Sequence, residues 1–323
     1  MSATTRSASE PTEDVTLREI AIEPSGARAC PGAPEASERS VAAVSMRAAM
    51  DAATSRSMTD SIRASRLAQA FTRKAFVAFV TGGDPSLADT RRFVRELAAA
   101  GASMVEIGVP FSDPTAEGPV IADASARALA AGTRLADLFD LVDALRREDG
   151  LTIPLALMTY LNPVHHFGYA AFFARAAQVG VDALIVPDLP YEEHGELSGL
   201  ARDAGVALIS MIAPTSDAGR VRTIAKDAVG FVYLVSSLGV TGVRTEISTD
   251  VAGIVAEIRA VTDVPVAVGF GISTPRQAAQ LAKVADGVIV GSAIVRLIER
   301  DGAGADPAIR EFARGMVTAI RPN

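Results

Sequence analysis

Residues 76–109, FVAFVTGGDPSLADTRRFVRELAAAGASMVEIGV, contain the repeating unit that decides the fold of this chain. Its two apolar runs, 76–81 and 104–109, read as strands that are buried on both faces. Between them, residues 91–100 read as a helix that stops at Gly101. A strand, a helix and a second strand in this order are typical of a βα unit, which builds a parallel sheet.

The same unit recurs along the rest of the chain. Six further apolar or β-branched runs read as strands, at 155–160, 183–187, 207–212, 231–236, 266–270 and 287–291. Helices between them include 169–179, which stops at Gly180, and 192–204, which stops at Gly205. An additional helical segment at 134–147 fits as an insertion after the second strand. Eight strands with intervening helices predict a (β/α)8 barrel, or TIM barrel, and a doubly wound sheet is the alternative.

The first 57 residues differ in composition from the rest of the chain. They contain no Phe, Tyr or Trp and only six Ile, Leu or Val. Such a segment buries too little apolar area to offset the entropy that ordering its backbone would cost. We therefore expect residues 1–57 to form a disordered N-terminal tail and residues 58–323 to form the barrel domain. Met46, Met50 and Met58 are alternative starting positions.

Composition excludes several classes of partner and site. The net charge is −7, whereas proteins that bind a nucleic-acid backbone normally carry a basic surface. The single cysteine, Cys30, cannot form an internal disulfide, and His165, His166 and His194 form no metal-ligand pattern with it. No run is apolar enough for a membrane span, and the N-terminus does not resemble a signal peptide. The sequence therefore predicts a cytoplasmic protein without a bound metal.

The second predicted strand carries a carboxylate on its interior face. Met104, Glu106 and Gly108 share one face of residues 104–109, because side chains alternate along a strand. Burial raises the pKa of a carboxyl group towards neutrality, as a general acid or base requires. The alternative is a structural ion pair, although none of the eight predicted strands contains Lys or Arg. Since barrel enzymes carry their chemistry at the carboxyl ends of the strands, Glu106 is a candidate catalytic residue.

A polar loop follows this strand. Residues 110–119, PFSDPTAEGP, carry Asp113 and Glu117. Two more carboxylates beside a buried one suggest acid/base pairing. The alternative, favoured for one of the two, is that Asp113 caps a turn or that Glu117 is solvated.

Two glycine-rich loops follow the last two predicted strands. They are GFGIS at 269–273 and GSAIV at 291–295, and each leads towards a helix. Glycine allows backbone N–H groups to approach an anion, and a helix N-terminus attracts negative charge. Barrels commonly bind phosphate at these two loops, although a Gly-x-Gly alone often marks only a tight turn. A longer glycine-bearing loop at 236–248 reads as a mobile lid or as an ordinary flexible loop.

Six motifs in order and spacing resemble the tryptophan synthase alpha subunit family, from about Phe71 to the C-terminus. They are AFVTGGDP (78–85), VEIGVPFSDPTAEGP (105–119), MTYLNPV (158–164), YLVSSLGVTG (233–242), GFGIS and GSAIV. The resemblance implies a barrel lyase that cleaves indole-3-glycerol phosphate to indole and glyceraldehyde 3-phosphate. It also implies that indole passes to a pyridoxal-phosphate beta subunit within a tetramer of two alpha and two beta subunits. The alpha subunit itself is expected to need no cofactor.

The resemblance assigns roles residue by residue. Glu106 takes the place of the family's acid/base glutamate, and Glu117 that of its second carboxylate. Residues expected to line the indole pocket or its lid are Phe79, Tyr160, Tyr233 and Thr241. Residues expected to hold the phosphate are Gly242, Gly269, Phe270, Gly271, Gly291 and Ser292. Residues expected at the interface with the partner subunit are Pro110, Asp113, Pro114 and Asn162.

Two positions depart from the family pattern. Glu117 stands where the family has aspartate, and Thr115 stands where it has leucine. The extra methylene moves the carboxylate that should stabilise positive charge on the indole ring. A regulatory partner of a beta subunit that has lost turnover is therefore an alternative function. A third is a different lyase or isomerase acting on a three-carbon phosphate, and Phe79 and Tyr160 could be simple barrel packing.

Overall fold

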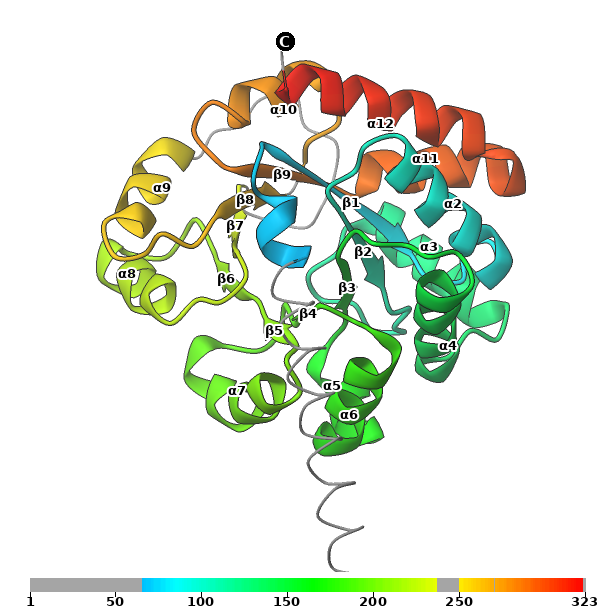
Figure 1. Cartoon of the computed structure of the whole chain (residues 1–323), viewed down its shortest axis with the longest axis horizontal. Helices are drawn as coiled ribbons and strands as arrows, with labels where there is room; N and C mark the ends of the chain where they lie inside the picture. The colour runs from blue at the N-terminus through cyan, green and yellow to red at the C-terminus, as the bar shows by residue number, and fades with distance from the viewer. Residues whose placement is uncertain (1–65, 237–249, 270, 322–323) are drawn as a thin grey trace, which may run out of the picture. The chain divides into compact units, whose positions relative to one another are not determined.

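The computed structural model describes residues 66–236, 250–269 and 271–321 (Figure 1). These residues belong to one compact unit, 52–323. Within the described ranges the strands are β1 (Ala75–Thr81), β2 (Met104–Gly108), β3 (Leu155–Met158), β4 (Ala183–Ile185), β5 (Ala207–Leu208), β6 (Ser210–Ile212), β7 (Val232–Val235), β8 (Val266–Gly269) and β9 (Gly287–Val290). All eight predicted strands are present, and the one predicted at 207–212 is divided into β5 and β6.

The strands form a closed parallel barrel. Their order is β5-β4-β3-β2-β1-β9-β8-β7-β6, so the two outermost strands are neighbours in the chain, separated only by Ile209. Ala207 pairs with Ala183 of β4, whereas Ser210 pairs with Val232 of β7. One stretch of chain thus bonds to both edges and closes the sheet. The predicted (β/α)8 barrel is confirmed, and the doubly wound alternative is wrong.

Helices surround the barrel. The described ones after residue 70 are α2 (Leu87–Ala99), α3 (Pro119–Ala130), α4 (Leu135–Arg147), α5 (Leu161–Phe167), α6 (Tyr169–Val179), α7 (His194–Asp203), α8 (Ala218–Lys226), α9 (Val251–Arg259), α10 (Pro275–Leu281), α11 (Ser292–Asp301) and α12 (Asp306–Ile320). Two short 3₁₀ turns precede α7 and α12, at Tyr191–Glu193 and Gly302–Gly304. The helix predicted from residue 91 begins earlier, because the Ser86 side chain accepts a hydrogen bond from the backbone N–H of Asp89 and caps it.

An additional helix does follow the second strand, but it is not the predicted segment 134–147. Both α3 and α4 follow β2, and α4 packs between α2 and α6 in the outer ring. The helix that is extra to the ring is α3, which packs on β1 and α11 near the carboxyl end of the barrel. Similarly, α12 lies in the ring between α10 and α2, so α11 is extra as well. These two helices frame the end of the barrel where the βα loops gather.

The alternation of side chains divides the core into two layers. Phe76 and Val80 of β1 pack outward with the helices, whereas Val77 and Phe79 point into the barrel. At the amino end of the barrel, the rings of Phe71 and Phe231 lie 5.4 Å apart and fill the interior. Any large site inside the barrel is therefore expected at its carboxyl end.

The predicted tail lies outside the described residues, so its disorder and the boundary at residue 57 stay predictions. The part of the lid loop at 237–249 lies outside them too. In the part of the chain that the structure describes, every helix is too short or too polar to cross a bilayer.

Candidate active site

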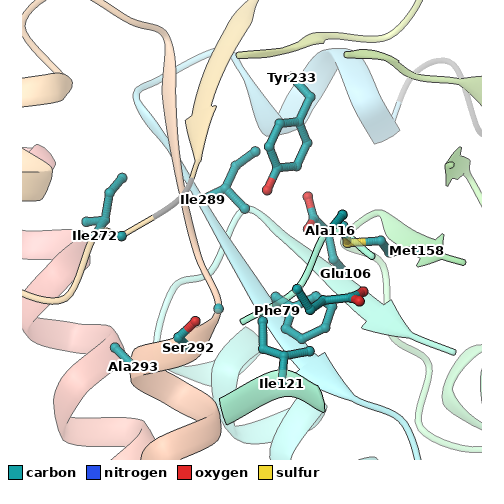
Figure 2. A pocket seen from close by; sticks show the side chains of 13 residues that line it. Phe79, Glu106, Ala116, Ile121, Met158, Tyr233, Ile272, Ile289, Ser292 and Ala293 are labelled. Atoms are coloured by element: carbon teal, nitrogen blue, oxygen red, sulfur yellow. The ribbon is translucent and has the colours of Figure 1, made fainter. Parts of the chain in front are cut away.

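A pocket opens at the carboxyl end of the barrel (Figure 2). Its walls come from β1, β2, β3, β7 and β9, from α3, and from the loops after β2, β8 and β9. The residues that line it are Phe79, Glu106, Ala116, Glu117, Ile121, Met158, Tyr233, Gly271, Ile272, Ile289, Gly291, Ser292 and Ala293. The structure thus brings both predicted glutamates together with residues of both glycine-rich loops.

Glu106 is buried, and the described residues offer it no charge partner. It lies on β2 between Phe79 of β1 and Ala156 of β3, and its exposed fraction is 0%. Among the described residues, neither carboxyl oxygen of Glu106 has a hydrogen-bond partner, so the structural ion pair is wrong. Burial raises the pKa of Glu106 to about 8. At neutral pH this side chain is therefore mainly protonated and can donate a proton.

Tyr233 faces Glu106 across the pocket. Its hydroxyl points towards the carboxyl group of Glu106 (Figure 2). Burial, and after it the charge of Glu106, raise the pKa of Tyr233, which keeps the phenol neutral. The Tyr233 ring lies over Gly269 at the end of the neighbouring strand β8, because a Cβ on Gly269 would come within 2.6 Å of the Tyr233 hydroxyl. Gly269 thus makes room for an aromatic side chain.

Phe79 is placed in the same way. A Cβ on Gly108 would come within 2.5 Å of the Phe79 ring, so this glycine of β2 lets the ring lie beside Glu106. Phe79 therefore packs in the barrel and also lines the pocket, and the two interpretations of this residue are not exclusive.

Glu117 is held at the pocket by Tyr160. The Tyr160 hydroxyl donates a hydrogen bond to Oε2 of Glu117 and accepts one from the backbone N–H of Ala116 at 2.8 Å. The rings of Phe111 and Tyr160 are 5.1 Å apart, which supports the tyrosine from its other side. Burial raises the pKa of Glu117, and the hydrogen bond from Tyr160 partly offsets this. The solvated alternative is therefore wrong for Glu117. Tyr160 is not among the residues that line the pocket, contrary to the expectation, and it acts on the pocket through Glu117.

Asp113 lies apart from this pair. It is exposed, and Oδ2 accepts a hydrogen bond from the hydroxyl of the adjacent Ser112 at 2.5 Å. It does not line the pocket. The pairing of Asp113 with Glu106 is therefore wrong. The turn-capping role of Asp113 stays a prediction, because its hydrogen bond comes from the side chain of Ser112 and not from a backbone N–H.

The two glycine-rich loops meet on the opposite wall of the pocket. Gly271 has a φ of 79°, a conformation that favours glycine, and α11 begins at Ser292 directly after Gly291. The N–H groups of Ile294 and Val295 donate to the carbonyl of Gly291. The N–H groups of Ser292 and Ala293, in the first turn of α11, therefore have no acceptor within the helix and are directed out of its N-terminus. Backbone N–H groups and the helix dipole at this position can hold a phosphate.

Several predicted site residues fall elsewhere. Thr241, Gly242 and Phe270 lie outside the described residues. The four predicted interface residues lie on or near the rim: Asp113 and Asn162 are exposed, Pro114 is half-buried and Pro110 is buried. Among the described residues, no group of three His, Cys, Asp or Glu side chains could hold a metal.

Several apolar residues of the pocket wall were not identified from the sequence. Met158 and Ile289 face the pocket, and strand alternation carries that signal, since Met158 is two residues after interior Ala156. Ile121 and Ile272 come from α3 and from the loop after β8. Their placement depends on the path of the chain outside the strands, for which the sequence carries no periodic signal.

Comparisons with known proteins agree on one family. The family described as "Tryptophan synthase alpha chain" matches residues 66–318. A tryptophan synthase alpha chain from Halorhodospira halophila is 52% identical over 249 residues, which cover 77% of this chain and 90% of that one. One from Lactiplantibacillus plantarum is 50% identical over 247 residues, with 76% and 92% covered. The solved tryptophan synthase of Mycobacterium tuberculosis superposes with a TM-score of 0.72 at 33% identity and covers 81% of this chain and 97% of the other.

Proposed function

The chain belongs to the tryptophan synthase alpha chain family, and from that membership we propose that Glu106 and Glu117 divide the work of its reaction. The protein is a carbon-carbon lyase that cleaves indole-3-glycerol phosphate to indole and glyceraldehyde 3-phosphate. The observation that supports our assignment is the fully buried Glu106 without a hydrogen-bond partner among the described residues, in one pocket with Glu117.

Glu106 transfers the proton in both directions. With a pKa of about 8 it begins as a carboxylic acid and donates its proton to C3 of the indole ring. The resulting carboxylate accepts the proton of the glycerol hydroxyl next to the scissile carbon-carbon bond. As that bond breaks, its electron pair restores the aromatic indole and the hydroxyl carbon becomes the aldehyde. Glu106 ends protonated, so the cycle needs no cofactor.

Glu117 stabilises the charge that this step creates. Protonation at C3 places positive charge on the indole nitrogen, and an ionised carboxylate that accepts the N–H hydrogen bond stabilises it. Tyr160 donates to Oε2 of Glu117, and we assign the indole N–H to Oε1. The same hydrogen bond from Tyr160 counteracts the rise in the Glu117 pKa that burial causes. Tyr160 is therefore a positioning residue that also favours the ionised form.

The substrate is held between two kinds of wall. The apolar side chains of Phe79, Met158 and Ile289 take the indole ring, and Tyr233 lies beside Glu106. At the other wall, Gly271, Gly291 and Ser292 offer backbone donors and the N-terminus of α11 to the phosphate. On the family resemblance we include Gly242 and Phe270 in the phosphate site and Thr241 in the lid. Gly269 is instead proposed to make room for the Tyr233 ring, and it is not among the residues that line the pocket.

The partner of this chain is a tryptophan synthase beta subunit. One of the similar solved structures is a tryptophan synthase complex from Pyrococcus furiosus, at a TM-score of 0.70 and 34% identity. We propose a tetramer of two alpha and two beta subunits that works in the cytoplasm. Pro110, Asp113, Pro114 and Asn162 form part of the surface that meets the beta subunit.

The test is indole release from indole-3-glycerol phosphate by the purified full chain, with and without a beta subunit. We expect release by the parent, and a decrease of about 10²- to 10⁴-fold for Glu106→Gln, which keeps the shape but cannot cycle a proton. Glu196→Gln, on the exposed surface of α7, is the control and should match the parent. If Glu106→Gln released indole at the parental rate, the role assigned to Glu106 would be wrong.

A regulatory partner without turnover is the alternative that Glu117 raised, and the tryptophan synthase alpha chains at about 50% identity do not favour it. It requires a chain that binds glycerol 3-phosphate and a beta subunit but releases no indole under either condition. The same assay therefore separates the two functions.

A further inference from the structure

A second cavity lies at the amino end of the barrel, opposite the candidate active site. Its volume is about 230 Å³, and it is lined by the segments that precede β1, β2 and β3 and by the residue that follows α12. Three arginines line it, Arg66, Arg73 and Arg321, and its lining contains no Asp or Glu among the described residues. We refer to it as the arginine cavity.

Positive charge beside the arginine cavity exceeds negative charge. Arg66 binds Oδ1 of Asp182 at 2.6 Å, and Arg146 behind it binds Oδ2 of the same carboxylate at 2.5 Å. Asp182 is completely buried, so two guanidinium groups share a single counter-charge. Counted over the described residues alone, this trio carries one more positive than negative charge, which is unfavourable at a partly buried position.

Arg321 has no ion-pair partner in the part of the chain that the structure describes. Its Nε donates to the carbonyl of Lys74 at 2.7 Å and its Nη2 to the hydroxyl of Ser103 at 2.5 Å, and both acceptors are neutral. Burial, and after it the positive charge of Arg73, lower the pKa of Arg321. Arg73 itself forms no ion pair within the described ranges and is exposed at the mouth of the cavity.

The donors match one chemical class of ligand. Guanidinium groups present paired N–H donors that fit the oxygens of phosphate or of a phosphate ester. The Ser103 hydroxyl accepts hydrogen bonds from Phe76 and Arg321, so its own proton is free to be donated to an anion. A volume of about 230 Å³ exceeds the roughly 30 Å³ that one water occupies in the liquid. It can hold a phosphoryl group with a short organic remainder.

We propose that the arginine cavity binds a phosphoryl group, either as free phosphate or as the head of a small phosphate monoester, at a site separate from the active site. A bound dianion there contacts Arg66, Arg73 and Arg321 together. It thereby links the segment before β1 to the end of α12. Because the ligand binds the folded chain, it also stabilises the fold by mass action.

The experiment is a calorimetric titration of the full chain with inorganic phosphate, with chloride keeping the ionic strength constant. We expect two classes of site, one in the active site and one in the arginine cavity. Arg73→Gln and Arg321→Gln should each weaken one class at least tenfold. Arg202→Gln is the control, because Arg202 on α7 is 80% exposed and its contact with Asp203 is 3.7 Å. It should leave both classes unchanged.

A second measurement separates the two sites. Phosphate should compete with indole-3-glycerol phosphate during indole release, and the inhibition constant should be the same for Arg73→Gln as for the parent. Absence of competition would count against the proposed phosphate wall of the active site and not against the arginine cavity. The proposal would be overturned if the isotherms of both arginine variants matched that of the parent. It would also be overturned if Arg73→Gln weakened the inhibition of indole release by phosphate as much as it weakened phosphate binding.

Two further arms complete the test. Arg321→Gln removes hydrogen bonds to the backbone, so if this variant does not fold, Arg73→Gln alone decides. Titration with glycerol 3-phosphate identifies the source of the ligand: binding of both probes to the class that Arg73→Gln weakens supports a phosphate monoester. Binding of inorganic phosphate alone supports the free anion, and binding of neither overturns the site.

Discussion

The Tyr160 hydroxyl joins the loop after β2 to the end of β3 by donating a hydrogen bond to the Glu117 carboxylate. The same oxygen accepts a hydrogen bond from the N–H of Ala116 at 2.8 Å. One hydroxyl thus fixes both the backbone and the side chain of the loop that carries the second carboxylate. A glutamate, which has one more rotatable bond than aspartate, depends on such an anchor to keep its second oxygen in place.

The first prediction is that Tyr160→Phe lowers kcat/KM for indole release by about 10- to 100-fold, because a small misplacement of Glu117 is costly. The hydrogen bond from Tyr160 lowers the pKa of Glu117, so its loss should also move the acidic limb of the pH–rate profile to higher pH. Tyr191→Phe is the matched control, since Tyr191 donates a similar hydrogen bond to Asp227 on the exposed surface. An unmoved acidic limb would show that Tyr160 only packs.

The second prediction concerns the length of Glu117. The Glu117 carboxylate accepts the hydrogen bond from Tyr160 with a side chain that is one methylene longer than that of aspartate. Glu117→Asp should therefore break this hydrogen bond and slow the reaction. Glu117→Ala should slow it further by removing the charge that stabilises protonated indole. Steady-state kinetics on both variants check this order. If Glu117→Asp were faster than the parent, the loop would instead be tuned to aspartate, and if neither variant changed the rate, Glu117 would have no part in the reaction.

The third prediction separates two explanations of Gly269. The sequence assigned this glycine to phosphate binding, whereas a Cβ there would come within 2.6 Å of the Tyr233 hydroxyl. Gly269→Ala should therefore displace the ring of Tyr233 beside Glu106 and lower kcat more than it raises KM. Gly199→Ala, in open space on α7, is the control. A variant whose only defect is weaker affinity for glycerol 3-phosphate would favour the phosphate role.

The barrel and its principal carboxylate could be predicted because both depend on periodic patterns. Alternating side chains in residues 104–109 place Glu106 inside, and the number of strand-helix units, eight, favours a barrel over a doubly wound sheet. The division of 207–212 at Ile209 could not be predicted, because it follows from pairing with β4 on one side and β7 on the other. The bond between Tyr160 and Glu117 was also out of reach, since it joins residues 43 positions apart through an irregular loop.

The fourth prediction concerns the N-terminal segment. Since residues 1–57 contain few aliphatic and no aromatic residues, a chain that starts at Met58 should fold and release indole as the full chain does. Thermal unfolding and indole release measured side by side check this. A decrease of several degrees in Tm, or the loss of most activity, would show that the segment contributes to the barrel.

The last prediction follows from the burial of Glu106. In the unfolded chain its pKa is near 4.5, and in the folded chain it is raised to about 8. The contribution of Glu106 to the free energy of unfolding is therefore largest below pH 4.5. It decreases by about 1.4 kcal/mol per pH unit as the pH rises from 4.5 to about 8. Glu106→Gln removes the titration, so the free energy of unfolding of this variant should exceed that of the parent by an amount that grows from pH 5 to pH 8. Denaturant titrations of the parent, Glu106→Gln and the exposed control Glu196→Gln at several pH values check it, because all other titrating groups cancel in the difference. A difference between Glu106→Gln and the parent that does not change with pH would mean that Glu106 ionises normally inside the barrel, and its assignment as the proton donor would then be wrong.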